Sequence, residues 1–204
     1  MPQQEPEKIL VRISEVLEQL GIQYCITGGF AVAVWGRPRA TADIDIIVEL
    51  FPSHVEPLHA ALRKISRAGY FDEDTVRKAI LKKGEFNFIE PESGMKVDFW
   101  LRQQDEYGRN QLKRRRLELI FGKKMYFISA EDLIISKLRW YASSGSARQL
   151  EDVESILKIS GEKLDMKYLK KWAAKFEVGE VLQSLSEDRC FCGSGKKYKK
   201  CHGM

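Results

Sequence analysis

The sequence predicts a mixed α/β (α+β) fold, in which a sheet of parallel and antiparallel strands is flanked by helices. Three observations predict it. Strand-like and helix-like patterns alternate over residues 1–128, a strong hairpin signal at 85–101 supplies antiparallel neighbours, and only helical patterns follow over 129–186. Residues 187–204 carry clustered cysteines and are expected to form a small zinc knuckle. The chain is therefore predicted to have three parts: 1–128, 129–186 and 187–204.

The individual elements are predicted from the spacing of apolar residues. Helices are expected where apolar residues recur at i, i+4 and i+7, and strands where short apolar or alternating runs occur. The predicted helices span 8–20, 30–35, 53–68, 72–83, 130–142, 148–158, 166–177 and about 179–185. The predicted strands span 22–27, 43–49, 85–90 and 95–101, with a further hairpin between 117 and 128 around Gly122.

Residues at the ends of these segments support the assignments. Gly21 and Gly84 are placed to end the helices before them, because glycine adopts the backbone conformation common after a last helical turn. Ser53 and Asp72 are suitable N-caps. Ser129-Ala-Glu-Asp132 resembles a capping box, so a helix is expected to begin directly after Ser129.

Composition sets broad limits on the kind of protein. The 204 residues are 44% hydrophobic and 31% charged, which is ordinary for a globular protein. The longest apolar runs are shorter than a membrane span, and the first residues show neither a basic region nor an apolar core typical of a secretory signal. We therefore expect a cytoplasmic protein without a membrane partner.

The net charge of +5 is unevenly distributed. Residues 109–126 hold seven Lys or Arg against one Glu, and the last 18 residues hold five against two Asp or Glu. Such patches suit nucleic acid or nucleotide phosphates. An ordinary solvated surface that keeps the protein soluble is an equally open interpretation for either patch, including the run Lys113-Arg-Arg-Arg116.

The most informative stretch runs from Tyr24 to Val48 and contains a Gly28-Gly29 turn and two carboxylates, Asp43 and Asp45. Side chains at i and i+2 of a strand point to the same face, and two like charges side by side are costly unless a cation joins them. Backbone N–H groups at a glycine turn that opens a helix suit a phosphate. Together these features indicate metal-assisted phosphoryl or nucleotidyl transfer.

A third carboxylate, Asp98, is available in the strand 95–101, on the face opposite Val97 and Phe99. A carboxylate in so apolar a strand is costly unless it is paired or bound to metal. If this strand lies beside 43–49, three carboxylates converge and suit Mg²⁺. The alternatives are that Asp98 is a buried partner of Arg102, and that Asp43 and Asp45 form only the polar end of a sheet.

These residues carry a resemblance to a known family. Thr27-Gly-Gly, Gly36, Arg39-Ala-Thr41, Asp43-Ile-Asp45 and Val97-Asp98-Phe99 resemble the DNA polymerase β-like nucleotidyltransferase superfamily. Ser129-Ala-Glu-Asp-Leu-Ile-Ile-Ser-Lys-Leu138 is similar to a helix of its abortive-infection and toxin-type members. Their following Arg-x-Lys-Asp-x-x-Asp segment reads Arg148-Gln-Leu-Glu-Asp152 here, so the Lys-Asp pair is altered while the final acidic residue is kept as Asp152.

The resemblance implies a role for each matching residue. Gly28 and Gly29 would grip a nucleoside triphosphate, while Asp43, Asp45 and Asp98 would be catalytic and hold Mg²⁺. The other expected nucleotide-binding residues are Arg39, Thr41, Lys137 and Asp152, with Lys137 on phosphate and Asp152 orienting Lys137 or the substrate. Simpler interpretations also exist, in which Arg39 faces solvent, Lys137 extends its amino group to solvent and the glycines form an ordinary turn.

The C-terminal residues contain four metal-binding side chains within 13 residues: Cys190, Cys192, Cys201 and His202. In a cytosolic chain this spacing suits a tetrahedral structural Zn²⁺ site, because so short a segment cannot bury a core of its own. The segment closely resembles the SEC-C motif. The alternative is a disordered basic tail with reactive thiols, and the lysines within it suit docking to RNA, the ribosome or an acidic protein.

The resemblance implies an enzyme that transfers a nucleoside monophosphate from a nucleoside triphosphate to a hydroxyl of a macromolecule, with Mg²⁺. The expected acceptor is RNA, such as a tRNA 3′ end, or a protein side chain, in a toxin–antitoxin or phage-defence setting with a possible antitoxin partner. A second hypothesis from the same residues is a non-catalytic nucleotide-binding or RNA-binding module, which docks to a partner through the zinc knuckle.

Overall fold

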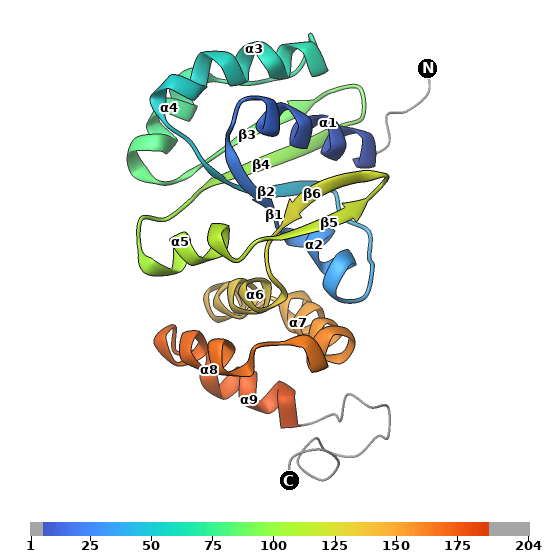
Figure 1. Cartoon of the computed structure of the whole chain (residues 1–204), viewed down its shortest axis with the longest axis vertical. Helices are drawn as coiled ribbons and strands as arrows, with labels where there is room; N and C mark the ends of the chain where they lie inside the picture. The colour runs from blue at the N-terminus through green and yellow to red at the C-terminus, as the bar shows by residue number, and fades with distance from the viewer. Residues whose placement is uncertain (1–5, 188–204) are drawn as a thin grey trace. The chain divides into compact units, whose positions relative to one another are not determined.

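The computed structural model describes residues 6–187, and these confirm the predicted mixed α/β class (Figure 1). The helices are α1 (Pro6–Gln19), α2 (Gly28–Trp35), α3 (Val55–Ile65), α4 (Glu73–Lys82), α5 (Glu106–Lys113), α6 (Ala130–Ser144), α7 (Ala147–Ser160), α8 (Met166–Lys175) and α9 (Gly179–Glu187). Short 3₁₀ turns cover Pro52–His54 and Gly161–Lys163. The strands are β1 (Gln23–Ile26), β2 (Asp43–Glu49), β3 (Glu85–Glu90), β4 (Met95–Leu101), β5 (Arg116–Ile120) and β6 (Lys123–Phe127).

The six strands form one mixed sheet in the order β3-β4-β2-β1-β6-β5. The two predicted hairpins, β3–β4 and β5–β6, are present and antiparallel, as is the pair β1–β2. The pairs β2–β4 and β1–β6 are parallel. The strand that carries Asp98 therefore lies directly beside the strand that carries Asp43 and Asp45.

The chain divides into two compact units, and each unit is made of two segments that are separated in the sequence. The first, here called the sheet unit, comprises the described residues up to Phe30 together with Ala40–Ile128. The second, the helical unit, comprises the described residues from Ser129 onward together with Ala31–Arg39. Helix α2 thus begins in one unit and ends in the other. The three-part division stays a prediction, and its last part lies outside the described residues.

The core of the sheet unit follows from strand alternation. Ile44, Ile46 and Val48 are fully buried, whereas Asp43 and Asp45 on the other face of β2 are partly exposed. Helices α1, α3 and α4 lie together on one side of the sheet (Figure 1). Burial of each such aliphatic side chain contributes roughly 1.5–3 kcal/mol, so the apolar face anchors β2 while its polar face stays available.

The helical unit is held by α6, which packs against α7 and α8. The predicted cap at Ser129 is confirmed, because its Oγ accepts a hydrogen bond from the Asp132 N–H at 3.1 Å. Asp132 is itself buried and accepts hydrogen bonds from the Ser129 hydroxyl at 2.7 Å and the Tyr168 hydroxyl at 2.7 Å. These contacts join the start of α6 to α8 around the buried Trp172.

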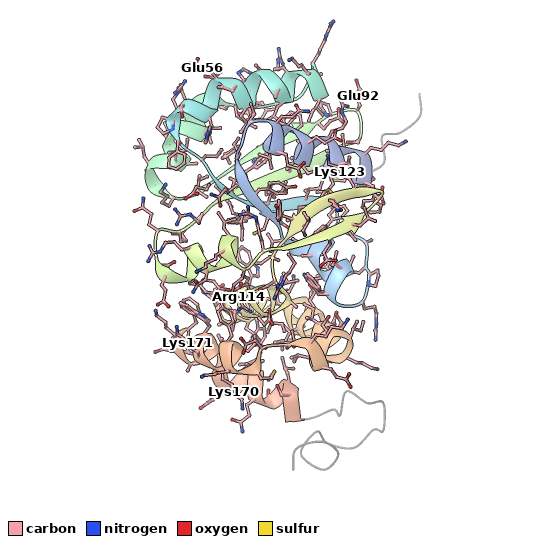
Figure 2. All side chains as sticks on the ribbon, in the orientation of Figure 1. Glu56, Glu92, Arg114, Lys123, Lys170 and Lys171 are labelled. Carbon is pink, nitrogen blue, oxygen red and sulfur yellow. The ribbon has the colours of Figure 1, made fainter. Side chains whose placement is uncertain are left out.

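Helix α5 was not predicted from the sequence, because it is short, contains Gly108 and has few apolar residues. Asp105 caps it by accepting from the Gly108 N–H at 2.7 Å. A Cβ on Gly108 would lie 2.3 Å from the Gln103 carbonyl oxygen, so the close approach requires glycine. The basic run that follows does not form one helix face, since Lys113 ends α5 and Arg116 begins β5, with Arg114 at the junction (Figure 2).

Two further boundaries differ from the prediction. The helix predicted over 53–68 begins as a 3₁₀ turn at Pro52 and its α-helical part ends at Ile65. The glycine pair lies inside the first turn of α2 instead of preceding it. None of the described helices is both long and apolar enough to cross a membrane.

Candidate functional site

The polar face of β2 and β4 is the strongest candidate for a functional site. The parallel register places Asp43 opposite Lys96, Asp45 opposite Asp98 and Ile47 opposite Trp100. Alternation therefore brings all six side chains to one face of two adjacent strands, about 5 Å apart. Along the two strands, the oppositely charged pair Asp43 and Lys96 is followed on the same face by the like-charged pair Asp45 and Asp98.

The pair Asp45 and Asp98 is energetically unfavourable by itself, because like charges directly opposite each other destabilise a sheet. The Lys96 ammonium compensates part of this cost, since its Nζ lies 2.8 Å from Oδ1 and 2.9 Å from Oδ2 of Asp98. The hydrogen bond to Asp98 raises the pKa of Lys96 and keeps it charged. The alternative in which Asp98 pairs with Arg102 is wrong, because Arg102 instead contacts Glu49 at 2.9 Å.

The glycine turn lies against these carboxylates. Gly28 has a φ of 60°, which side-chain-bearing residues rarely adopt, and a Cβ there would be 1.9 Å from Oδ2 of Asp45. A Cβ on Gly29 would be 2.5 Å from Oγ1 of Thr41. Both glycines are therefore required by close packing of the start of α2 against the side chains of Asp45 and Thr41, and an ordinary turn would need neither.

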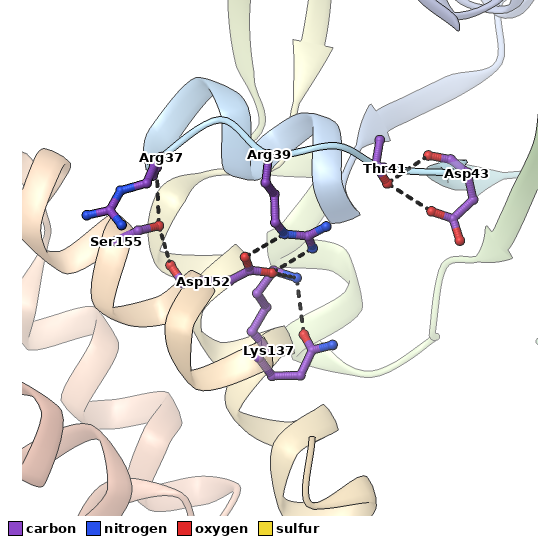
Figure 3. A network of polar contacts seen from close by, with 8 residues as sticks. Arg37, Arg39, Thr41, Asp43, Lys137, Asp152 and Ser155 are labelled. Atoms are coloured by element: carbon purple, nitrogen blue, oxygen red, sulfur yellow. Dashed lines mark hydrogen bonds and ion pairs between the residues drawn. The ribbon is translucent and has the colours of Figure 1, made fainter. Parts of the chain in front are cut away.

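Hydrogen bonds orient the two aspartates of β2. The Thr41 hydroxyl donates to Oδ1 of Asp43 at 3.0 Å (Figure 3), and the Trp100 indole N–H donates to Oδ1 of Asp45 at 3.2 Å. Carboxylate oxygens of this kind are the ligands that Mg²⁺ prefers. Between residues 6 and 187, no group of three or more His, Cys, Asp or Glu side chains is arranged to hold a metal ion.

A second polar cluster forms within the helical unit around Asp152 (Figure 3). The Arg39 guanidinium donates to both carboxylate oxygens of Asp152, with Nε and Nη2 each at 2.8 Å. The Lys137 ammonium lies 2.7 Å from Oδ2 of Asp152 and donates to Oε1 of Gln149 at 3.1 Å. The side chains of Lys137 and Asp152 are only 8% and 4% exposed.

This cluster overturns two of the simpler interpretations. Lys137 does not extend to solvent, because its ammonium is buried on Asp152. Arg39 is not simply solvent-facing, since its Nε and Nη2 donate to the two oxygens of the Asp152 carboxylate. Burial alone would raise the pKa of Asp152, but hydrogen bonds from Arg39 and Lys137 outweigh burial and lower it. Two cations share one carboxylate, so the cluster carries one positive charge in excess.

The segment that carries Arg39 is fastened to α7 by backbone contacts. The Arg37 N–H donates to Oγ of Ser155 at 3.2 Å (Figure 3), and the Ser160 hydroxyl donates to the Trp35 carbonyl at 2.6 Å. A Cβ on Gly36 would lie 2.5 Å from Oγ of Ser155. These two contacts hold the backbone just before Arg39 against the part of α7 that follows Asp152.

Sequence reasoning missed three participants: Lys96, Trp100 and Gln149. The first two share a strand face with Asp98, so alternation signalled their position but not their partners. Gln149 occupies the altered segment that follows α6, where it accepts from Lys137 instead of supplying a charge. The four predicted zinc ligands, Cys190, Cys192, Cys201 and His202, lie outside the described residues.

Comparisons with known proteins agree with this architecture. Residues 188–203 match the SEC-C motif. The solution structure of the antibiotic-resistance factor ANT(2'')-Ia is similar over 86% of this chain and 93% of its own, at 13% identity and a TM-score of 0.57. ANT(2'')-Ia in complex with adenylyl-2''-tobramycin is similar over 83% and 95% of the two chains, at 12% identity and a TM-score of 0.54.

An antigenic nucleotidyltransferase-like protein from Paracoccidioides brasiliensis is similar over 96% of both chains, at 18% identity and a TM-score of 0.51. No curated protein matches the chain by sequence. At these identities the similarity shows the fold alone. The chain has a nucleotidyltransferase-type fold. Within residues 27–98, the aspartates that carry the resemblance to such proteins lie on the polar face of β2 and β4.

Proposed function

We propose that this chain, which has a nucleotidyltransferase-type fold, transfers a nucleoside monophosphate from a nucleoside triphosphate to a hydroxyl of a macromolecular acceptor. One observation carries the proposal: Asp45 and Asp98 stand side by side on adjacent strands, against a glycine turn at a helix start. A sheet gains no stability from such a like-charge pair. The arrangement is explained if a divalent cation is the intended partner.

The cation we assign is Mg²⁺, held by Asp43, Asp45 and Asp98. The donor set fits it, because all three offer hard carboxylate oxygens on one face of two adjacent strands, and two of them repel each other without a cation. When bound, the ion would neutralise developing charge on the transferred phosphoryl group and activate the acceptor hydroxyl. The residues themselves orient the site, since Thr41 and Trp100 fix the carboxylates of Asp43 and Asp45.

In each of the two units, taken separately, we assign residues a role in nucleotide binding. Gly28 and Gly29 place backbone N–H groups at the start of α2, where anions are favoured. Arg39 and Lys137 share the single carboxylate of Asp152, and this excess positive charge suits a phosphate. Asp152 acts as the positioning residue of the cluster, because it orients both cations.

The SEC-C match in 188–203 supports a structural zinc site formed by Cys190, Cys192, Cys201 and His202. We propose that this segment docks the enzyme to a partner, with an acidic protein, the ribosome and RNA as candidates. Metal analysis of the purified chain should show about one Zn²⁺ per chain, which is lost on Cys190→Ser/Cys192→Ser. Zinc content that those substitutions do not change would exclude this ligand set.

One of the structures similar to this chain contains a product that indicates its acceptor. ANT(2'')-Ia was captured with an adenylylated antibiotic. For this chain we favour RNA or a protein, because seven basic residues cluster in 109–126. A toxin–antitoxin or phage-defence role follows from the resemblance of its motifs, and we expect expression of the active chain, but not of an inactive variant, to arrest growth.

A non-catalytic nucleotide-binding or RNA-binding module is the second candidate. It is favoured by Lys96, whose ammonium already occupies both oxygens of Asp98. In a pure binder this pairing would replace the metal. The difference between the two candidates is therefore whether Mg²⁺ competes successfully with Lys96.

The test is a transfer assay with Mg²⁺, each nucleoside triphosphate labelled at the α-phosphate, and a mixed pool of total RNA and protein. We expect label to appear on one acceptor class with the native chain and to be absent with Asp45→Asn. Asp74→Asn, an exposed change on α4, is the matched control and should label normally. Equal absence of label with the native chain and Asp45→Asn would favour the binding module.

A further inference from the structure

A hollow of about 480 Å³ lies in the sheet unit and plays no part in the site above. It is formed where the end of β2, the loop after β4, helix α5 and strand β6 meet. The side chains that characterise it are Glu49, Arg102, Arg109, Lys113, Arg115 and Tyr126. Four of these six are cationic and one is acidic.

The cations of this hollow differ in how far they are neutralised. Arg102 is held by Glu49, so the two charges cancel. Within the described part of the chain, no carboxylate lies at ion-pair distance from Arg109, Lys113 or Arg115. Arg109 and Lys113 are exposed and stand one helical turn apart on α5. The hollow therefore presents about three uncompensated positive charges to solvent.

Arg115 is held in position by neutral groups. Its Nη1 donates to Oε1 of Gln23 at 3.0 Å and to the carbonyl of Leu112 at 3.2 Å. Its guanidinium carbon lies 4.4 Å from the centroid of the Tyr126 ring. A guanidinium fixed by a ring and by neutral acceptors keeps its full charge and needs little ordering to bind a phosphate.

The hollow continues the functional face of β2. Glu49 follows Asp45 by four residues, so strand alternation places both side chains on the same face. At the usual rise of a strand they are about 13 Å apart. A chain of phosphates in the hollow would be within a few nucleotides of Asp45, at a distance that suits the body of an acceptor whose end reacts.

We propose that this hollow binds the sugar–phosphate backbone of an RNA acceptor, through Arg109, Lys113 and Arg115. This inference rests on the proposed function for its biological meaning, but the binding itself does not require turnover. Two cations one turn apart on α5 and a third in the segment between α5 and β5 suit a row of phosphates. An isolated triphosphate would instead need them to converge on one point.

The test measures binding of a fluorescently labelled single-stranded RNA 20-mer to the full chain, without Mg²⁺ or nucleotide, over a series of salt concentrations. The test variant is Arg109→Glu/Lys113→Glu. The matched control is Lys78→Glu/Lys82→Glu, which makes the same charge change at the same spacing on exposed positions of α4. We expect the test variant to bind at least about tenfold more weakly, with a salt slope lower by roughly 1.4.

The control variant should bind RNA nearly as well as the native chain. Equal weakening by both variants would show that only net charge matters and would overturn the proposal, as would an unchanged affinity in the test variant. If the test variant lost binding of nucleoside triphosphate instead of RNA, the hollow would be a donor site, which also contradicts the proposal. Equal affinity of the native chain for polyglutamate of matched charge would point to a protein partner and overturn it too.

These outcomes are independent of the proposed function. A failure of nucleotidyl transfer would appear as absence of label in the transfer assay, while the RNA affinity could still depend on Arg109 and Lys113. Conversely, Asp98→Asn should leave RNA binding unchanged even where it abolishes transfer. A loss of RNA binding with Asp98→Asn would mean that the carboxylate face, and not the hollow, controls the contact.

Discussion

The polar face of β2 and β4 and the cluster around Asp152 are both built from ion pairs of similar length, but their charge balance is opposite. The first sets three carboxylates against the Lys96 ammonium on two adjacent strands. The second sets Arg39 and Lys137 against one carboxylate. One region has an excess of negative charge that suits a metal ion, and the other has an excess of positive charge that suits a phosphate.

The two regions also differ in the burial of their ion pairs, and this difference decides whether a substitution affects activity or also stability. The Asp98 side chain is 14% exposed and its partner Lys96 is 47% exposed, so solvent weakens their attraction. The Lys137 and Asp152 side chains are almost completely buried, so removal of the Asp152 carboxylate leaves the Lys137 ammonium with an uncompensated charge. We therefore expect changes on the polar face of β2 and β4 to affect activity alone, and changes in the cluster around Asp152 to affect both activity and stability.

The largest expected effect is on catalysis by Asp98→Asn. The substitution keeps the shape of the side chain but removes the like charge opposite Asp45, so transfer should fall by about 1000-fold or more. The melting temperature should remain within a few degrees or rise, because a repulsive pair has been removed. A large loss of thermal stability would contradict the view that this face carries little of the folding energy.

The next effect is on stability, through Asp152→Asn. This change leaves the buried Lys137 ammonium without its counter-charge, so the free energy of unfolding should fall by about 3–5 kcal/mol. Urea unfolding of the variant measures this loss, with the exposed Asp74→Asn as the control. A loss below about 1 kcal/mol would mean that Arg39 and Lys137 are balanced by other groups.

Asp152 should also make the free energy of unfolding depend on pH in the acidic range. Its pKa is lower in the folded chain than in the unfolded chain, because Arg39 and Lys137 stabilise the carboxylate. The stabilisation is therefore present in full above about pH 4 and is lost as the pH falls through the folded pKa. Unfolding measured between pH 7 and pH 3 should show a shallower acid decline in Asp152→Asn, and an identical decline in both chains would refute the assignment.

The smallest expected effect concerns metal affinity, through Lys96→Met. Removal of the ammonium frees both oxygens of Asp98, so binding of Mn²⁺, used as a spectroscopic substitute for Mg²⁺, should tighten by up to about fivefold. Calorimetric titration measures this without reference to activity. Weaker Mn²⁺ binding in Lys96→Met would show that the ammonium supports the site instead of competing with the ion.

Particular residues show how far sequence reasoning reached. Alternation in 43–49 and 95–101 predicted which side chains share a face, because the period of a strand is local. It did not predict that Asp45 lies opposite Asp98, since the parallel register of β2 and β4 depends on a connection of more than 40 residues that local patterns do not describe. Helix α5 was missed because tertiary contacts at Gly108 and the Asp105 cap stabilise it against a weak intrinsic preference.

By itself the sequence determined the mixed α/β class, the glycine turn, the three carboxylates and the order of most elements, because all of these depend on short-range spacing. Only the tertiary structure decided how the charges are distributed. It brought Arg39, Lys137 and Asp152 together across more than 95 residues of sequence. It also paired Arg102 with Glu49 and Lys96 with Asp98. Ion pairing acts through space over a few ångströms, so its partners are set by packing and not by their separation along the chain.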